Sequence, residues 1–210
     1  MLRTIAAFLL LFPVFAQQPL PNGNELVKRS GDALAKYKSY KCDLDVEIVI
    51  VMGGNPTPVS VTQSLAVVNP DKMRVELRSQ MGESTTVSDG ENVWNYVPAL
   101  KRYMRKSAMR ARQGMLESLG LGDALKAGDK AKTLRQESLQ IDGSTYSCSV
   151  VETRTDKITQ PGDTELTEVV TTLWIDKDMI TRQITIAGIL QGGQLPGAAE
   201  MTEKIVVRAL

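Results

Sequence analysis

The chain has 210 residues, with 25 lysines and arginines against 24 aspartates and glutamates, and no histidine. The absence of histidine excludes catalytic triads and metal sites built on imidazole. The sequence also contains no Gly-rich phosphate loop, HExxH, GxSxG or CxxC pattern. With a net charge of +1, affinity for a charged partner must come from the local distribution of charge, and no nucleic-acid partner, metal or cofactor is expected.

Residues 1–16 have the pattern of a secretory signal peptide, with Arg3 before an apolar run and small residues leading to Ala16. The run is shorter than the roughly 20 residues that span a bilayer. We therefore expect export with cleavage after Ala16, a short leader over 17–24 and a single domain over 25–210. Residues 1–16 also hold all three phenylalanines, so aliphatic residues, methionine, tryptophan and tyrosine must build the core.

An amphipathic helix is predicted from about Glu25 to Lys38, with Asn24 as its N-cap. The hydrophobic period then changes from 3.6 to 2. From Tyr40 to Met52, apolar residues alternate with Lys41, Asp43 and other polar residues, which predicts a long strand buried on one face.

Further strand patterns recur along the rest of the chain, separated by turn residues such as Asp89-Gly90 and Asp142-Gly143. Between them, helical spacing broken by glycines predicts short helices over about 107–130. The predicted fold is therefore α+β and mainly β, a curled antiparallel sheet of about ten or eleven strands with helices available to fill its concave face. The expected strands are 59–68, 73–79, 83–88, 92–97, 102–106, 133–141, 144–154, 165–175, 180–189 and 201–209.

Cys42 and Cys148 are the only cysteines. In an exported chain an even count predicts one disulfide between them, and the alternative is two buried thiols.

Paired carboxylates, Asp43 with Asp45 and Asp176 with Asp178, could indicate a hydrolase or a calcium site. We favour a structural role, because the first pair lies on the polar face of a predicted strand and the second in a hairpin turn.

The segment from Asn92 to Met115 contains no acidic residue and is rich in cations and methionines. Its charge suits lipid phosphates, an anionic membrane surface or an acidic partner, although such a run can also be ordinary solvated surface. Its methionines suit either an adaptable apolar binding surface or core packing. The cations are Lys101, Arg102, Arg105, Lys106, Arg110 and Arg112, and the methionines are Met104, Met109 and Met115.

The order of motifs from Pro70 through Val87-Ser88-Asp89-Gly90 to Trp94, Tyr96 and Pro98 resembles the central hairpins of the LolA/LolB superfamily of periplasmic lipoprotein carriers. The segment LWIDKDMITRQ, residues 173–183, resembles the hairpin in the second half of that superfamily. The chain departs from the narrow carrier pattern at Asn69, where carriers have arginine, and in having no phenylalanine after residue 16. It therefore looks like a divergent member.

The resemblance implies a curved half-barrel whose concave side is plugged by helices and whose apolar cavity accepts acyl chains. On this interpretation the cations listed above form a basic rim and Met109, Met115 and Leu119 belong to a lid. The predicted lining is Val46, Ile48, Ile50, Met73, Val75, Leu77, Trp94, Tyr96 and Met104.

The leading functional prediction is a periplasmic, non-enzymatic and monomeric carrier of lipoprotein acyl chains or another lipid, which could meet donor or acceptor proteins at membranes. The alternative is an envelope sensor or protein-interaction module with the same fold, because fold alone does not decide function.

Overall fold

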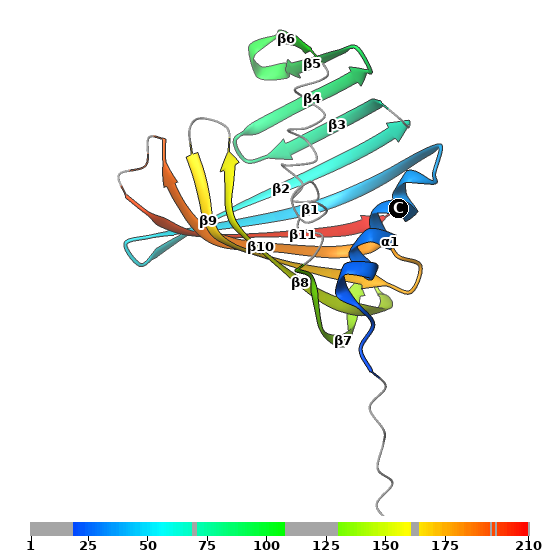
Figure 1. The fold of residues 1–210 in the computed structure, drawn as a ribbon. Coiled ribbons are helices and arrows are strands. Elements are labelled where there is room, and N and C mark those ends of the chain that lie inside the picture. The colour runs from blue at the N-terminus through cyan, green and yellow to red at the C-terminus, as the bar shows by residue number, and fades with distance from the viewer. Residues whose placement is uncertain are drawn as a thin grey trace, which may run out of the picture.

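The computed structural model describes residues 19–68, 71–107, 130–160, 164–193, 195 and 197–209. In this part of the chain one antiparallel sheet of eleven strands has the order β6-β5-β4-β3-β2-β1-β11-β10-β9-β8-β7. The sheet curves along this order, and one α-helix of the described residues lies against one face (Figure 1). The predicted mainly β, open half-barrel is confirmed. The predicted signal peptide over 1–16 lies outside the described residues.

The strands form two meanders. The first comprises β1 (Ser39–Met52), β2 (Asn55–Val68), β3 (Lys72–Ser79), β4 (Gly82–Asp89), β5 (Asn92–Val97) and β6 (Arg102–Ser107), with the 3-10 helix η1 (Pro98–Leu100) before β6. The second comprises β7 (Lys132–Ile141), β8 (Ser144–Gln160), β9 (Thr164–Asp176), β10 (Thr181–Gly192) and β11 (Ala199–Ala209). Pairing of β1 with β11 joins the two meanders into one sheet.

The helix α1 (Gly23–Ala35) begins two residues earlier than predicted. Its N-cap is Asn22 rather than Asn24, and the side chain of Asn22 accepts a hydrogen bond from the backbone N–H of Glu25 at 3.2 Å. Asn24 instead accepts the backbone N–H of Ala131 at 2.7 Å and so fastens the helix to the chain just before β7. A sequence pattern cannot distinguish these two uses of asparagine.

Strand β2 is longer than predicted and includes Pro56 and Pro58. The pairing of β2 with β3 begins only at Val61, so the start of β2 has β1 alone as its neighbour. Proline lacks an N–H donor and is tolerated at such a local edge. The hairpin of β1 and β2 therefore projects beyond β3.

The alternation predicted for β1 is confirmed. Cys42, Leu44 and Val46 are buried, Asp43 and Asp45 between them are half-buried, and the flanking Lys41 and Glu47 are exposed. We call the face that carries the three buried residues the inner face, and the opposite face the outer face. Residues directly opposite each other in antiparallel strands share a face, so the register assigns the other strands as well.

The centre of the core is a row of inner-face residues across five strands. Val46 lies opposite Ile205, which lies opposite Ile184, and the row continues through Leu173 to Val151. All five side chains are buried, and Leu26 and Val27 of α1 belong to the same cluster. Burial of such a side chain contributes about 1.5–3 kcal/mol, which makes this row the main source of stability.

The turn from β9 to β10 is held by a buried carboxylate. Asp176 accepts the backbone N–H groups of Asp178 and Ile180, each at 2.9 Å, and forms an ion pair with the Arg182 guanidinium at 2.7 Å. The Arg182 guanidinium also lies over the ring of Tyr146 on β8, 4.3 Å from its centroid. These contacts assign Asp176 a structural role, as the sequence favoured.

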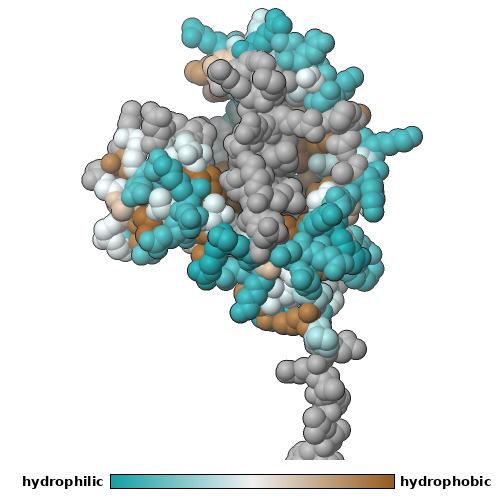
Figure 2. Space-filling view, viewed as in Figure 1, coloured by the Kyte–Doolittle hydropathy of each residue, from teal (hydrophilic) through white to brown (hydrophobic). Residues whose placement is uncertain are grey.

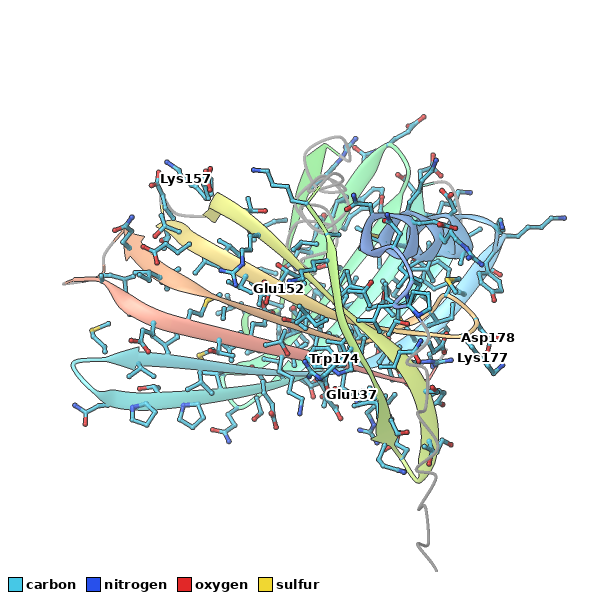
Figure 3. The ribbon with its side chains drawn as sticks, turned by 60° about the horizontal axis from the view of Figure 1, so that its bottom comes forward. Glu137, Glu152, Lys157, Trp174, Lys177 and Asp178 are labelled. Atoms are coloured by element: carbon cyan, nitrogen blue, oxygen red, sulfur yellow. The ribbon has the colours of Figure 1, made fainter. Side chains whose placement is uncertain are left out.

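Replacing Asp176 with alanine should lower the free energy of unfolding by about 3–5 kcal/mol, because it leaves a buried guanidinium and two N–H groups without their acceptor. The matched control is Asp178→Ala in the same turn. Asp178 pairs with Lys177 at an exposed position (Figure 3), so its loss should cost less than about 1 kcal/mol. Urea unfolding of both variants checks this, and equal losses would contradict the assignment.

Candidate functional site

The helix α1 covers one part of the inner face. It packs against β7, β8 and β9, and the Ser30 hydroxyl forms a hydrogen bond with the hydroxyl of Thr181 at 2.9 Å. The Thr133 hydroxyl donates to the carbonyl of Pro21 at 2.6 Å, which also fixes the segment before the helix. Among the described residues, α1 is therefore the element that covers the second meander.

On the first meander the inner face remains apolar but is less enclosed. Most of the predicted lining lies here: Val46 is buried, whereas Ile48, Ile50, Met73, Val75 and Leu77 are half-buried. The register connects these strands directly, because Leu65 of β2 lies opposite both Cys42 of β1 and Val75 of β3. The six residues therefore share one mostly apolar inner face, which is the candidate site. Gln63, opposite Leu44 and Leu77, is a polar position within it, and Ile48 and Ile50 lie where β1 and β2 extend beyond β3.

The predicted lining by Trp94 and Tyr96 is wrong for this surface. Trp94 lies opposite Val87, Val87 opposite Arg74, and the pairing continues through Ala66 to Lys41 on the outer face. Tyr96 alternates with Trp94 in the same way and is 43% exposed. Sequence alternation put the two aromatic residues on one face, but only the register across five strands decides which face.

Met104 lies opposite Asn95, which faces the inner side, and is 55% exposed at the edge of the sheet. The described cations of the basic rim, Lys101, Arg102 and Arg105, are all exposed on or beside β6. They divide between the faces. Arg105 lies opposite the outer residue Trp94 and donates to the Asn92 side-chain oxygen at 2.8 Å, whereas Arg102 lies opposite Val97, which is on the inner face.

The remaining residues that the sequence predicts for the rim and the lid have no described side chains. Lys106 lies on β6, and its side chain is not among the described groups. Arg110 and Arg112 of the rim and Met109, Met115 and Leu119 of the lid lie outside the described residues.

The two cysteines are separate buried thiols, so the predicted disulfide is not formed. Cys42 belongs to the inner-face core cluster, whereas Cys148 lies on the outer face opposite Glu137 and Asp176. Strands β11, β10 and β9 separate β1 from β8. Four strand spacings amount to roughly 19 Å along the sheet, and a disulfide needs Cα atoms within about 7 Å. Burial raises the pKa of each thiol to about 11.

One residue of the inner face was missed by the sequence interpretation. Glu203 on β11 lies opposite Ile48 of β1 and Ile186 of β10, and it alternates with Met201 and Ile205 along its own strand. Burial raises the pKa of this carboxyl to about 7. The sequence of β11 does contain a signal for this position. Every second residue from Met201 to Val207 lies on one face, and Glu203 is the charged residue among apolar ones in that series.

The outer face is different in chemistry. It has a polar pocket of about 460 Å³, whose lining carries both signs of charge from β1, β3 and β11. Arg208 in this pocket forms ion pairs with Asp45 and with Asp142, each at 3.2 Å. On the same face, the Trp174 indole donates to Glu137, which Arg135 also contacts at 2.6 Å (Figure 3). Both tryptophans thus lie on the outer face.

Several outer charges are paired with one another, whereas the inner face of β1 to β3 has no charged residue and is therefore the candidate for an apolar ligand. In the space-filling view, polar residues cover much of the face seen, and hydrophobic residues show in smaller patches between them and at the lower edge (Figure 2). Within the described ranges, no group of three or more His, Cys, Asp or Glu residues is placed to hold a metal ion. No helix of the described part has the length and hydrophobicity of a transmembrane span.

The model of a family described as "Predicted periplasmic protein (DUF2092)" matches residues 23–126, from the start of α1 to beyond β6. No curated protein matches the chain in sequence at a significant level.

Several solved structures align with most of this chain at low TM-scores. LprF from Mycobacterium bovis has 11% identity and a TM-score of 0.45, with 90% of this chain and 93% of that chain covered. A LolA superfamily protein from Nitrosomonas europaea has 11% identity and a TM-score of 0.34 over 90% of this chain and 95% of that chain. The MucA/MucB complex of Pseudomonas aeruginosa has 12% identity and a TM-score of 0.43, over 89% of this chain and 55% of that chain.

These structures include a protein of the LolA superfamily, the superfamily that the sequence motifs resemble. At these identities and TM-scores the likeness carries no information on ligand or partner. The chemistry of this chain's own inner face must therefore support any functional conclusion.

The burial of Glu203 predicts a pH-dependent loss of stability. Its pKa is about 7 in the folded state against an ordinary value of 4.5, so the folded state keeps a proton that the unfolded state releases. Stability should therefore fall as the pH rises from about 4.5 through 7. Glu203→Gln, which cannot ionise, should be about 1–3 kcal/mol more stable than the natural protein at pH 8.

Urea unfolding of the two proteins at pH 4.5 and pH 8 checks this expectation. The difference between them should nearly vanish at the lower pH, because both side chains are then neutral. A difference of the same size at both pH values would show that the carboxyl is not desolvated.

Proposed function

We propose that the protein is a periplasmic carrier that holds the acyl chains of lipoproteins, or of another lipid, against the inner face of its sheet. The observation that carries the proposal is that Ile48, Ile50, Met73, Val75 and Leu77, which share the inner face, are apolar yet only half-buried. On this proposal the protein is not an enzyme, and it acts by binding and release.

The energetics favour an alkyl chain as the occupant. Each methylene group moved from water to an apolar surface contributes about 0.8 kcal/mol. The surface spans β1, β2 and β3 without a charged residue, because Lys41, Arg74, Glu76 and their neighbours point to the outer face. A flexible chain can follow such a surface without desolvating any fixed charge.

Export fits this role. The match to a family described as periplasmic supports an exported protein. On this proposal a signal peptide over residues 1–16 is cleaved near Ala16, followed by a leader over 17–24 and one domain over 25–210. The proposed lid of Met109, Met115 and Leu119 would cover the bound chain. The cations beside β6 would face lipid phosphates when the ligand is exchanged at a membrane.

A second candidate, a protein-interaction module, is favoured by the edge of the sheet at β6. Leu100 is 66% exposed and Tyr103 is 72% exposed beside Lys101 and Arg102. Exposed aromatic residues and arginines are enriched at protein interfaces. Crosslinking in cells would recover a protein partner without bound lipid if this role were the principal one.

The carrier proposal predicts that a charge on the inner face blocks binding. Leu77→Glu should weaken binding of a neutral, fluorophore-labelled dodecyl chain to the delipidated protein at least about tenfold, because the bound chain would have to desolvate a carboxylate. Leu77 lies outside the core cluster, so the fold should tolerate the change. Fluorescence titration gives the two dissociation constants.

The matched control is Thr62→Glu. Thr62 lies on β2 and is exposed on the outer face. It is adjacent in sequence to Gln63, the residue that pairs with Leu77 of β3. This variant should bind the probe as the natural protein does. No uptake by the natural protein, or equal weakening by both variants, would refute the carrier proposal.

A further inference from the structure

Glu203 is a charged residue in the middle of an uncharged surface. Its neighbours in register are Ile48 on one side and Ile186 on the other, with Met201 and Ile205 before and after it on the same face. The core row through Val46 and Ile205 lies one inner-face position away. The carboxyl is therefore placed at the border between the closed core and the half-buried candidate site.

No other charged side chain shares this surface on the strands around it. The register places every lysine, arginine, aspartate and other glutamate of β1, β2, β3 and β11 on the outer face, and β10 from Ile184 to Leu190 has none. Lys204 and Glu200, the nearest charged residues along β11, lie opposite Glu47 and Val51 and so alternate away from it.

Among the residues that the structure describes, Glu203 has neither a hydrogen-bond donor nor a cation as partner. A carboxylate on an apolar surface is costly unless a donor or a positive charge compensates it. Burial already raises the pKa of this group to about 7. The cost of desolvating the Glu203 carboxylate would be offset if the bound ligand supplied a positive charge or a hydrogen-bond donor at this position.

We propose that Glu203 selects the ligand, so that the inner face prefers amphiphiles whose alkyl chain carries a cationic amine. This inference rests on the proposed carrier function and adds the chemical class of the ligand's polar group. The alkyl chain would lie along the half-buried residues of β1 to β3, and the amine would meet the Glu203 carboxylate as a charge-assisted pair. An anionic head group at the same place would be repelled.

The test compares three probes with the same twelve-carbon chain on the delipidated protein at pH 8: dodecylammonium, dodecanol and laurate, each below the concentration at which it aggregates. Isothermal titration calorimetry should give binding about tenfold tighter for the ammonium probe than for dodecanol, with laurate weakest. Glu203→Gln should reduce the differences among the three to within about threefold. It should bind dodecanol at least as tightly as the natural protein does, because the variant has no carboxylate that the alkyl chain would desolvate.

Glu200→Gln is the matched control, since Glu200 is exposed on the outer face of the same strand. It should retain the order of the three probes. A preference that survives Glu203→Gln, a preference lost equally in Glu200→Gln, or the absence of any preference in the natural protein would overturn the inference. Failure of all three probes to bind the natural protein would instead refute the carrier function itself.

A measurement on the natural protein keeps the test independent of the variant's folding. The groups that face Glu203 from β1 and β10 are Ile48 and Ile186, neither of which titrates. The ratio of ammonium to dodecanol affinity should therefore fall severalfold between pH 8 and pH 5.5, as Glu203 takes up a proton. Neither probe changes charge in this range, so a constant ratio would overturn the inference.

Discussion

The pairing of β1 with β11 is the contact on which the rest of the structure depends. All other neighbouring strands are consecutive in the chain, so this pairing alone joins the first meander to the second. It brings Val46 beside Ile205 and thereby makes one core row out of residues from both halves. It also fixes Glu203 beside Ile48. A shift of the register by one residue would exchange the inner and outer faces of the second meander.

The two faces of this single curved sheet have different environments. Its inner face buries apolar side chains against one another and against α1, while its outer face meets water with paired charges such as Arg208 with Asp45 and Asp142. Because α1 lies over β7 to β9, the inner face of β1 to β3 keeps apolar residues that are only half-buried. In the proposed function, a hydrophobic ligand binds to these half-buried residues of β1 to β3.

Local patterns in the sequence predict much of this architecture and fail where long-range register decides. Alternation located all eleven strands and the buried side of β1, and Asp176 was rightly assigned to a turn. Alternation also placed Trp94 with Tyr96, but the inner side of β5 depends on the pairs that lead back to β1. The predicted disulfide was wrong for the same reason. An oxidising compartment and an even number of cysteines do not determine the faces on which Cys42 and Cys148 lie. Glu203 was readable from its own strand, yet only the neighbours on β1 and β10 make its position unusual.

The most direct test of the account is to map where an alkyl chain binds. The delipidated protein would be irradiated with a dodecanol analogue that carries a photoreactive diazirine on its chain, and the modified residues would be located by mass spectrometry of peptides. The account predicts adducts on inner-face residues of β1, β2 and β3, such as Ile50, Met73 and Leu77, with none at the outer pocket around Arg208. Adducts confined to the outer face, or spread equally over both faces, would contradict the claim that the inner face is the ligand-binding surface.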